Sequence, residues 1–252
     1  MIQKLRTPAL AAPLFGDWPE GILWACLQGR MGDVYVTEPM VSAAAVLGDF
    51  SFFAGMPDES LLDAVSAPLL TPQHDGWADA ITAHFGRGVQ AITRYATRKD
   101  TVFDRKMLQA YANRLPPSYT IRIINSELYN LCSRNTWSRD LVSQYPTWEC
   151  FQAMGLGCAV LRGQTLAAGA SSYAAFDGGI EIEIDTHPDF RRLGLARACG
   201  AALILRCLDR GLYPSWDAQN PISLTLAKQL GYTPGEPYRT FVKCSPLGEP
   251  VL

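Results

Sequence analysis

The sequence contains few residues of the kind that hold metal ions. Its 252 residues include only three histidines, and none of its seven cysteines belongs to a Cys-x-x-Cys pair. Structural zinc sites usually need such closely spaced ligands, so we predict that the protein has no metal cofactor. An odd number of widely spaced cysteines is typical of reduced thiols, which predicts a cytoplasmic protein.

The chain also lacks a basic cluster and a long apolar run. Its net charge of −2 argues against a nucleic-acid partner. The longest apolar runs, Met40–Leu47 and Ala201–Leu205, are too short to span a bilayer. Pro8 and Pro13 interrupt the N-terminal apolar stretch, which disfavours a signal peptide. We therefore expect no membrane partner, and the oligomeric state stays open, with a homodimer as one option.

The apolar content is ample for a packed core, because 48% of the residues are hydrophobic. Pro116-Pro117 ends a helix predicted over Arg105–Leu115, and we place a domain boundary at this break. Residues 1–116 are predicted to form a smaller α/β N-terminal domain, and residues 117–252 a second domain. In the first domain the pattern predicts helices at 19–28 and 77–85, and strands at 33–37, 50–54 and 89–96. Residues 41–47 suit a strand or a helix.

The second domain contains short strands joined by turn sequences. Strands are predicted at 119–124, 157–162, 165–173 and 180–186, and Gly163-Gln164 and Asp177-Gly178-Gly179 have the composition of hairpin connections. A long helix over Leu193–Arg210, a strand at 212–217, a helix after Asn220 and a last strand at 237–244 follow. This order predicts an α+β fold, with a mixed, mostly antiparallel central sheet and flanking helices.

One loop in this domain has the character of an anion site. The strand Ile180–Thr186 leads through a turn into a helix, whose first turn exposes unpaired N–H groups and the positive end of the helix dipole. Gly194 and Ala196 leave room for a phosphate, and Arg191 and Arg192 add positive charge. An ordinary strand-to-helix turn with solvated arginines would have the same local sequence. The loop lacks the Gly-Lys-Ser/Thr ending of a nucleotide P-loop.

Residues 118–252 resemble the GNAT N-acetyltransferase superfamily. The segment Arg191-x-x-Gly194-x-Ala196 matches the R/Q-x-x-G-x-G/A loop of that family, and Asn220 and the Leu-Gly-Tyr at 230–232 match its later motifs. More narrowly, the whole chain resembles a two-part bacterial group of this superfamily, although the resemblance of residues 1–115 is weaker. The resemblance implies a GNAT fold behind a diverged N-terminal domain, with acetyl-CoA as co-substrate. It implies this cofactor-binding set: Ile184, Asp185, Thr186, Arg191, Arg192, Leu193, Gly194, Leu195, Ala196, Asn220 and Ser223. Asn220 also suits a plain N-cap, and both roles stay open.

Three acids alternate with isoleucines along the strand before the loop. Glu181, Glu183 and Asp185 therefore share one face of the strand. Acetyl transfer needs a neutral amine, and a carboxylate can accept the proton that an ammonium loses. We take Glu183 as the first candidate for the base and Glu181 as the second. A solvated sheet face is the alternative interpretation.

The acceptor side is the least defined by the sequence. We assign Trp137, Trp216 and Asp217 to substrate binding, with core or turn roles as the alternative. The resemblance implies a tyrosine as general acid four residues before the final glycine, but Ala227 stands there. The predicted function is an N-acetyltransferase that transfers an acetyl group from acetyl-CoA to a primary amine of a small molecule or peptide. The alternative is a CoA-binding sensor or scaffold without catalysis.

Overall fold

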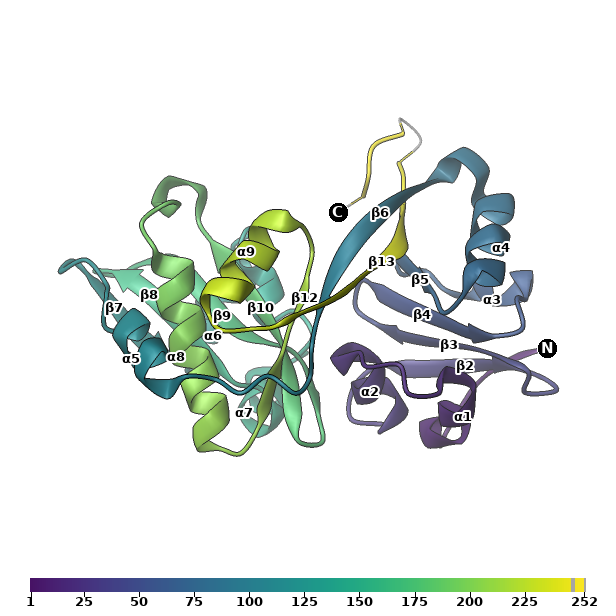
Figure 1. Ribbon diagram of the computed structural model, residues 1–252, viewed down its shortest axis with the longest axis horizontal. Coiled ribbons are helices and arrows are strands. Elements are labelled where there is room, and N and C mark those ends of the chain that lie inside the picture. Colours follow the sequence, from purple (N-terminus) through teal and green to yellow (C-terminus); the bar gives the residue numbers. More distant parts are fainter. Residues whose placement is uncertain (246–247, 252) are drawn as a thin grey trace. The chain divides into compact units, whose positions relative to one another are not determined.

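The computed structural model describes residues 1–245 and 248–251; residues 246, 247 and 252 of the predicted second domain lie outside the described residues. The chain divides into two compact units, Met1–Arg94 with Pro237–Leu252, and Tyr95–Glu236. Two strands run from one unit into the other, β6 (Val89–Thr97) and β13 (Pro234–Lys243) (Figure 1). Each unit has its own sheet.

The first unit contains a sheet with the strand order β1-β2-β3-β4-β5-β13. Its strands are antiparallel except for the parallel pair β4–β5. Trp77, Phe53 and Leu61 are fully buried in the core of this unit. The bounds of its elements are β1 Ile2–Lys4, η1 Pro8–Ala11, α1 Ala12–Phe15, α2 Gly21–Leu27, β2 Asp33–Thr37, β3 Ser42–Leu47, β4 Phe50–Gly55, α3 Glu59–Ala64, β5 Leu69–Pro72, α4 Asp75–Phe85 and η2 Gly86–Gly88.

The second unit contains a five-stranded sheet with the order β11-β10-β9-β8-β7. The strands β7 to β10 form an antiparallel meander, and β11 pairs with β10 in parallel. This is the mixed, mostly antiparallel sheet that the sequence predicts. The bounds of its elements are α5 Arg105–Ala112, β7 Tyr119–Ile123, α6 Ser126–Arg134, η3 Arg139–Leu141, α7 Trp148–Met154, β8 Gly157–Arg162, β9 Thr165–Phe176, β10 Gly179–Thr186, η4 Pro188–Phe190, α8 Leu195–Asp209, β11 Tyr213–Ser215, β12 Asp217–Ala218 and α9 Pro221–Gln229.

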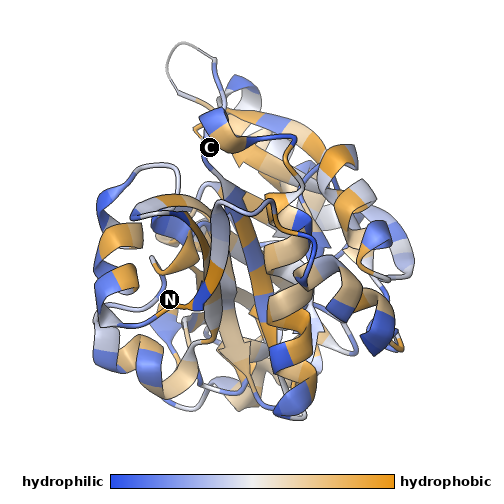
Figure 2. Cartoon of the chain, turned by 90° about the vertical axis from the view of Figure 1, so that its left-hand side faces the viewer, coloured by the Kyte–Doolittle hydropathy of each residue, from blue (hydrophilic) through white to orange (hydrophobic). Residues whose placement is uncertain are grey.

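The two faces of this sheet are covered by different segments. A Cβ on Gly200 of α8 would lie 2.9 Å from the Ile184 side chain, so α8 covers the face on which Ile184 lies. A Cβ on Gly169 would meet Leu141 of η3 instead, and Gly169 is the direct cross-strand partner of Asp185. Asp185 therefore lies on the η3 face, opposite to Ile184. In Figure 2 the helices carry hydrophilic and hydrophobic residues side by side, as expected for elements with one packed face.

The compact units divide the chain at other positions than the predicted domains 1–116 and 117–252. Helix α5, which precedes Pro116, packs on α8 within the second unit (Figure 1). α5 ends at Ala112, three residues before the predicted end at Leu115, and the two prolines lie inside the second compact unit. The apolar face of a short helix needs a partner, and the sequence does not show which one it takes.

Two predicted elements need correction. The long helix starts at Leu195, two residues later than predicted, because Gly194 has a left-handed φ of +76° and acts as the N-cap. The single strand predicted at 212–217 is two strands, which belong to different sheets. β11 pairs with β10, whereas β12 pairs with β6 through Asp217–Ala96 and Ala218–Tyr95.

No helix in the described ranges, 1–245 and 248–251, has the length and apolar character needed to cross a membrane. The longest, α8, has 15 residues.

Candidate active site

β11 and β12 diverge at Trp216, beside β10. We call this place, bounded by β10 on one side and by β11 and β12 on the other, the fork. β11 pairs with β10 only over Gly179–Glu181, and the chain then leaves at Trp216 for the other sheet. Along Ile182–Thr186, β10 keeps β9 on one side and has no paired strand on the other among the described residues. The amide of Ile184 donates to Oε1 of Glu183 at 3.2 Å, so this amide lies on the open edge. An extended group could bond the strand there, as a further strand would.

At the end of β10 the chain reaches the predicted anion loop. No side chain caps the N-terminus of α8, and no acid lies in its first turn. The first amides of a helix have no acceptor within the helix, so those of Leu195 and Ala196 are available to a ligand. Around Gly194, the nearest atom to an added Cβ is Arg197 Nη2 at 3.8 Å, which leaves open space.

The loop itself is positively charged and strained. Arg191 and Arg192 are both exposed. Arg192 has a φ of +64°, which is an unusual conformation for a residue with a side chain. With Gly194, the loop therefore has two left-handed residues next to a helix start. The six consecutive residues that the sequence assigned to the cofactor, Arg191 to Ala196, form this loop, and their contact with a cofactor stays a prediction.

The three acids of β10 lie in different surroundings. Glu183 and Asp185 are half-buried, opposite Ser171 and Gly169 of β9, whereas Glu181 is only 3% exposed. Oε1 of Glu181 accepts the backbone N–H of Asp217 at 2.7 Å. The pairing of β10 with β11 ends at Glu181, and this hydrogen bond then links β10 to β12. Glu181 therefore connects the two sides of the fork where they begin to diverge.

The other carboxylate oxygen of Glu181, Oε2, is buried and has no hydrogen-bond partner among the described residues. Burial raises the pKa of Glu181, against the opposite effects of Lys99 and Ser215. Lys99 donates to Oγ of Ser215 at 2.7 Å. The sequence analysis did not identify Lys99 or Ser215. The sequence carries no motif that would connect these two residues, because Lys99 lies more than a hundred residues before Ser215 in the chain.

Asp185 lies in a second acidic cluster. Burial and the neighbouring Asp140 raise the pKa of Asp185 to about 6, although Arg191 opposes the shift. Nearby, the ring of Trp137 packs edge-on against His187, with 5.3 Å between the ring centroids. Trp137 therefore lies next to the end of β10, on the same segment as Asp140. Its predicted contact with the substrate stays a prediction.

The remaining predicted residues lie on the other arm of the fork. Asn220 caps α9, since its Oδ1 accepts the amides of Ile222 and Ser223. This bond uses only the oxygen of the Asn220 amide. Trp216 is 4% exposed and packs edge-on against Tyr232, a placement that suits the core. Its predicted contact with substrate, like that of Asp217, stays a prediction.

No group of three or more His, Cys, Asp or Glu side chains suited to a metal ion occurs in the described part of the chain.

A family model for GNAT acetyltransferases matches residues 12–241, nearly the whole chain. The chain belongs to the GNAT acetyltransferase family. The solved structure of a GCN5-related N-acetyltransferase-like protein from Streptococcus suis 89/1591 is 48% identical, with a TM-score of 0.91 over 94% of this chain and 98% of that chain. The match thus includes both units, which confirms the resemblance to a GNAT protein with an additional, diverged N-terminal part.

Two other matches are more limited, the first in the fold alone and the second in sequence over part of the chain. A tandem GNAT protein from the clavulanic acid biosynthesis pathway is 12% identical, with a TM-score of 0.54 over 98% of this chain and 99% of that chain. An uncharacterized N-acetyltransferase, YdfB of Bacillus subtilis (strain 168), is 34% identical over 84 residues, which is 32% of each protein. The match therefore spans about a third of this curated relative. GNAT family membership supports acyl transfer in general, and enzymes of this family generally use acetyl-CoA.

Proposed function

We propose that this GNAT protein transfers the acetyl group of acetyl-CoA to a primary amine of a small molecule or peptide. The observation that carries the proposal is the continuity of two features in the second unit. The open edge of β10 leads directly into the uncapped start of α8. A long ligand with a diphosphate at one end and amide groups along its length would match both.

The loop residues fit the diphosphate. The amides of the first turn of α8 and the side chains of Arg191 and Arg192 are donors or positive charges, and no first-turn acid opposes them. On the open edge, the Ile184 amide would exchange its bond to Glu183 for one to the pantetheine arm. Asp185 and Thr186 follow on the same strand. Asn220 and Ser223 belong to the same proposed set on the other arm of the fork.

Glu183 is the stronger candidate for the base. A base must be reached by the amine and by water, and Glu183 is half-buried, whereas Glu181 is almost fully enclosed and bonded to the Asp217 amide. When the pantetheine arm takes over the Ile184 amide, the carboxylate of Glu183 loses this hydrogen bond. The carboxylate can then accept the proton of the amine. Glu181 acts in this proposal as a positioning residue that holds the fork.

A specific observation keeps a second function in view, that of a CoA-binding sensor or scaffold. Ala227, at the position of the family's tyrosine, is fully buried. The hydroxyls of Tyr232 and Tyr213 donate to the carbonyls of Pro214 and Arg98, so neither is free in this arrangement to protonate a leaving thiolate. The thiol of CoA needs little help to leave as a thiolate, since thiol pKa values are roughly 8–9. Catalysis therefore stays our first proposal.

The test combines binding and turnover. Acetyl-CoA should raise the melting temperature of the protein in a concentration-dependent way, because it binds the folded state. A panel of primary amines should then release free thiol in the presence of acetyl-CoA. Stabilisation without thiol release from any amine would favour the sensor, and no stabilisation at all would remove both functions.

A further inference from the structure

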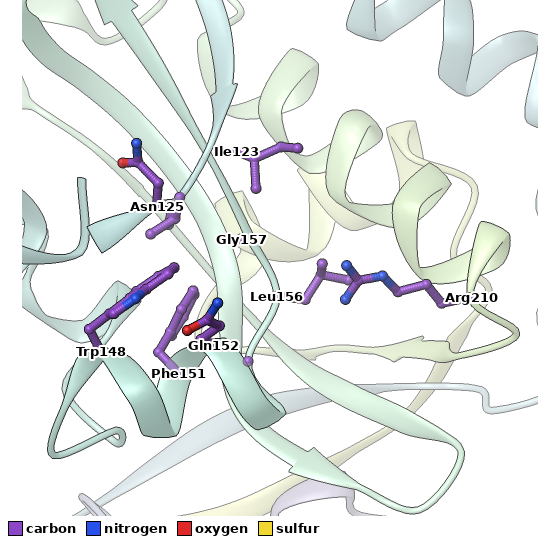
Figure 3. A pocket seen from close by; sticks show the side chains of 10 residues that line it. Ile123, Asn125, Trp148, Phe151, Gln152, Leu156, Gly157 and Arg210 are labelled. Atoms are coloured by element: carbon purple, nitrogen blue, oxygen red, sulfur yellow. The ribbon is translucent and has the colours of Figure 1, made fainter. Parts of the chain in front are cut away.

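A cavity of about 250 Å³ lies in the second unit, away from the fork. Its wall is formed by the end of β7, by α7, by the start of β8 and by the residue that follows α8. Figure 3 shows its side chains, with Trp148 and Phe151 on one side and Arg210 reaching in from the other. None of its lining residues belongs to the proposed acetyl-CoA site.

The cavity and the cofactor loop are at opposite ends of α8. Gly194 caps the start of this 15-residue helix, and Arg210 caps its end. At a rise of 1.5 Å per residue, the two ends are about 22 Å apart. A small molecule in the cavity would therefore leave the cofactor loop accessible.

One side of the cavity is aromatic and apolar. The rings of Trp148 and Phe151 are stacked, with 6.0 Å between their centroids and an angle of 30°. Leu156 and Phe151 are buried, whereas Ile123 at the rim is 52% exposed. Such a surface can bind the apolar part of a ligand, for example an aromatic ring or a branched aliphatic chain, and shield it from water.

The polar side presents donors without a partner. Two other arginines in this unit, Arg105 and Arg122, are paired with Asp209 and Glu127. Arg210, in contrast, has no carboxylate partner within the described ranges, and no acid lines the cavity. Asn125 uses its oxygen to cap α6, which leaves the NH₂ group of Asn125 as a further donor among the lining residues.

From these features we propose that the cavity is a binding site for a small carboxylate with an aromatic or branched apolar body. The carboxylate would accept bonds from the Arg210 guanidinium, which matches it in planar geometry. The body would lie against Trp148 and Phe151. No described Asp or Glu lines the cavity to pair with an ammonium group, so the lining favours a carboxylate over an amine. The inference does not rest on acetyl transfer.

The experiment uses 3-phenylpropionate as a probe of the full-length protein. Binding is followed by the indole N–H resonance of Trp148 in ¹⁵N-labelled protein, assigned with Trp148→Phe. We expect this resonance to shift with a Kd below about 10 mM, and we expect the neutral 3-phenyl-1-propanol to bind about tenfold more weakly. Arg210→Gln should weaken binding of the acid about tenfold or more.

Matched controls make the result decisive. Arg134→Gln removes another exposed arginine of this unit, outside the lining, and should leave the Kd unchanged. Saturation with acetyl-CoA should also leave it unchanged. The proposal is overturned if Trp148 does not respond, if Arg210→Gln or the neutral alcohol binds as well as wild type binds the acid, or if inorganic phosphate competes equally. Mutual exclusion with acetyl-CoA would also overturn it, because the cavity would then belong to the transferase site.

Discussion

Each unit contains a parallel strand that leads into a helix, but the two helix starts differ in charge and in access. In the first unit β5 leads to α4, whose first turn carries Asp75, paired with Arg239 at 2.7 Å. The His74 ring fills the space beside Gly76, 3.1 Å from an added Cβ. In the second unit the first turn of α8 has no acid, and the nearest atom to an added Cβ on Gly194 is 3.8 Å away. Neither helix start has a side-chain cap.

This difference teaches that a strand-to-helix turn is not by itself an anion site. Every helix start has free amides and a positive dipole end. At α4 a carboxylate and an imidazole ring occupy that end, while at α8 two arginines reinforce it. The following predictions test this contrast, from the largest expected effect to the smallest.

Gly194→Glu should reduce the affinity for acetyl-CoA at least about 100-fold, because it places a carboxylate at the site of the diphosphate and strains a left-handed backbone position. Calorimetric titration measures the affinity. Gly163→Glu is the matched control: Gly163 also has a positive φ, of +61°, and open surroundings. Equal affinity in the two variants would show that the loop does not hold the cofactor.

Glu183→Gln should lower kcat about 100-fold while the Kd for acetyl-CoA changes little, since the amide cannot accept the amine proton. Glu181→Gln keeps an oxygen that can accept the Asp217 amide, so its kcat should stay within about threefold of wild type. Thiol release measured from pH 6 to pH 9 with one active amine compares the two. The reverse order of effects would assign the base to Glu181.

Asp185→Asn should make the protein more stable above pH 6 and leave its stability unchanged near pH 4. Folding raises the pKa of Asp185 from 3.8 to about 6, so the unfolded chain loses this proton more easily than the folded protein. The free energy of unfolding of the wild type therefore falls as the pH rises from about 4 to about 6. The gain at pH 7.5 should be about 1–3 kcal/mol, reduced by partial solvent exposure.

Urea unfolding at pH 4 and pH 7.5 measures this difference. Asp189→Asn serves as the control, because the side chain of Asp189 is 83% exposed in the same segment. A stability difference that is the same at both pH values would contradict a buried, titrating Asp185.

Asp75→Asn should have the smallest effect. The pair with Arg239 is exposed, so its loss should change the free energy of unfolding by less than about 0.5 kcal/mol. The Kd for acetyl-CoA should not change, since α4 is not the cofactor helix. A loss of affinity for acetyl-CoA in this variant would contradict the claim that only the start of α8, and not that of α4, binds the cofactor.

Much of the fold was predictable, because local patterns dominate in the second unit. The hairpin turns at Gly163 and Gly178 and the cap Asn220 each have a sequence signal that the structure bears out. The strand at 41–47, which suited a helix as well, is β3; its pairing with β2 and β4 overrides the helical preference of its alanines.

The sequence by itself determined the chemistry that is available: a glycine–arginine loop at a helix start, and three acids on the strand before it. Only the tertiary structure decided how these acids differ. It enclosed Glu181 at the base of the fork, left Glu183 half-buried and placed Asp185 beside Asp140. The physical reason is that the burial and charge of a side chain depend on segments far away in the chain. Lys99, β12 and η3 come to lie beside β10 only after folding.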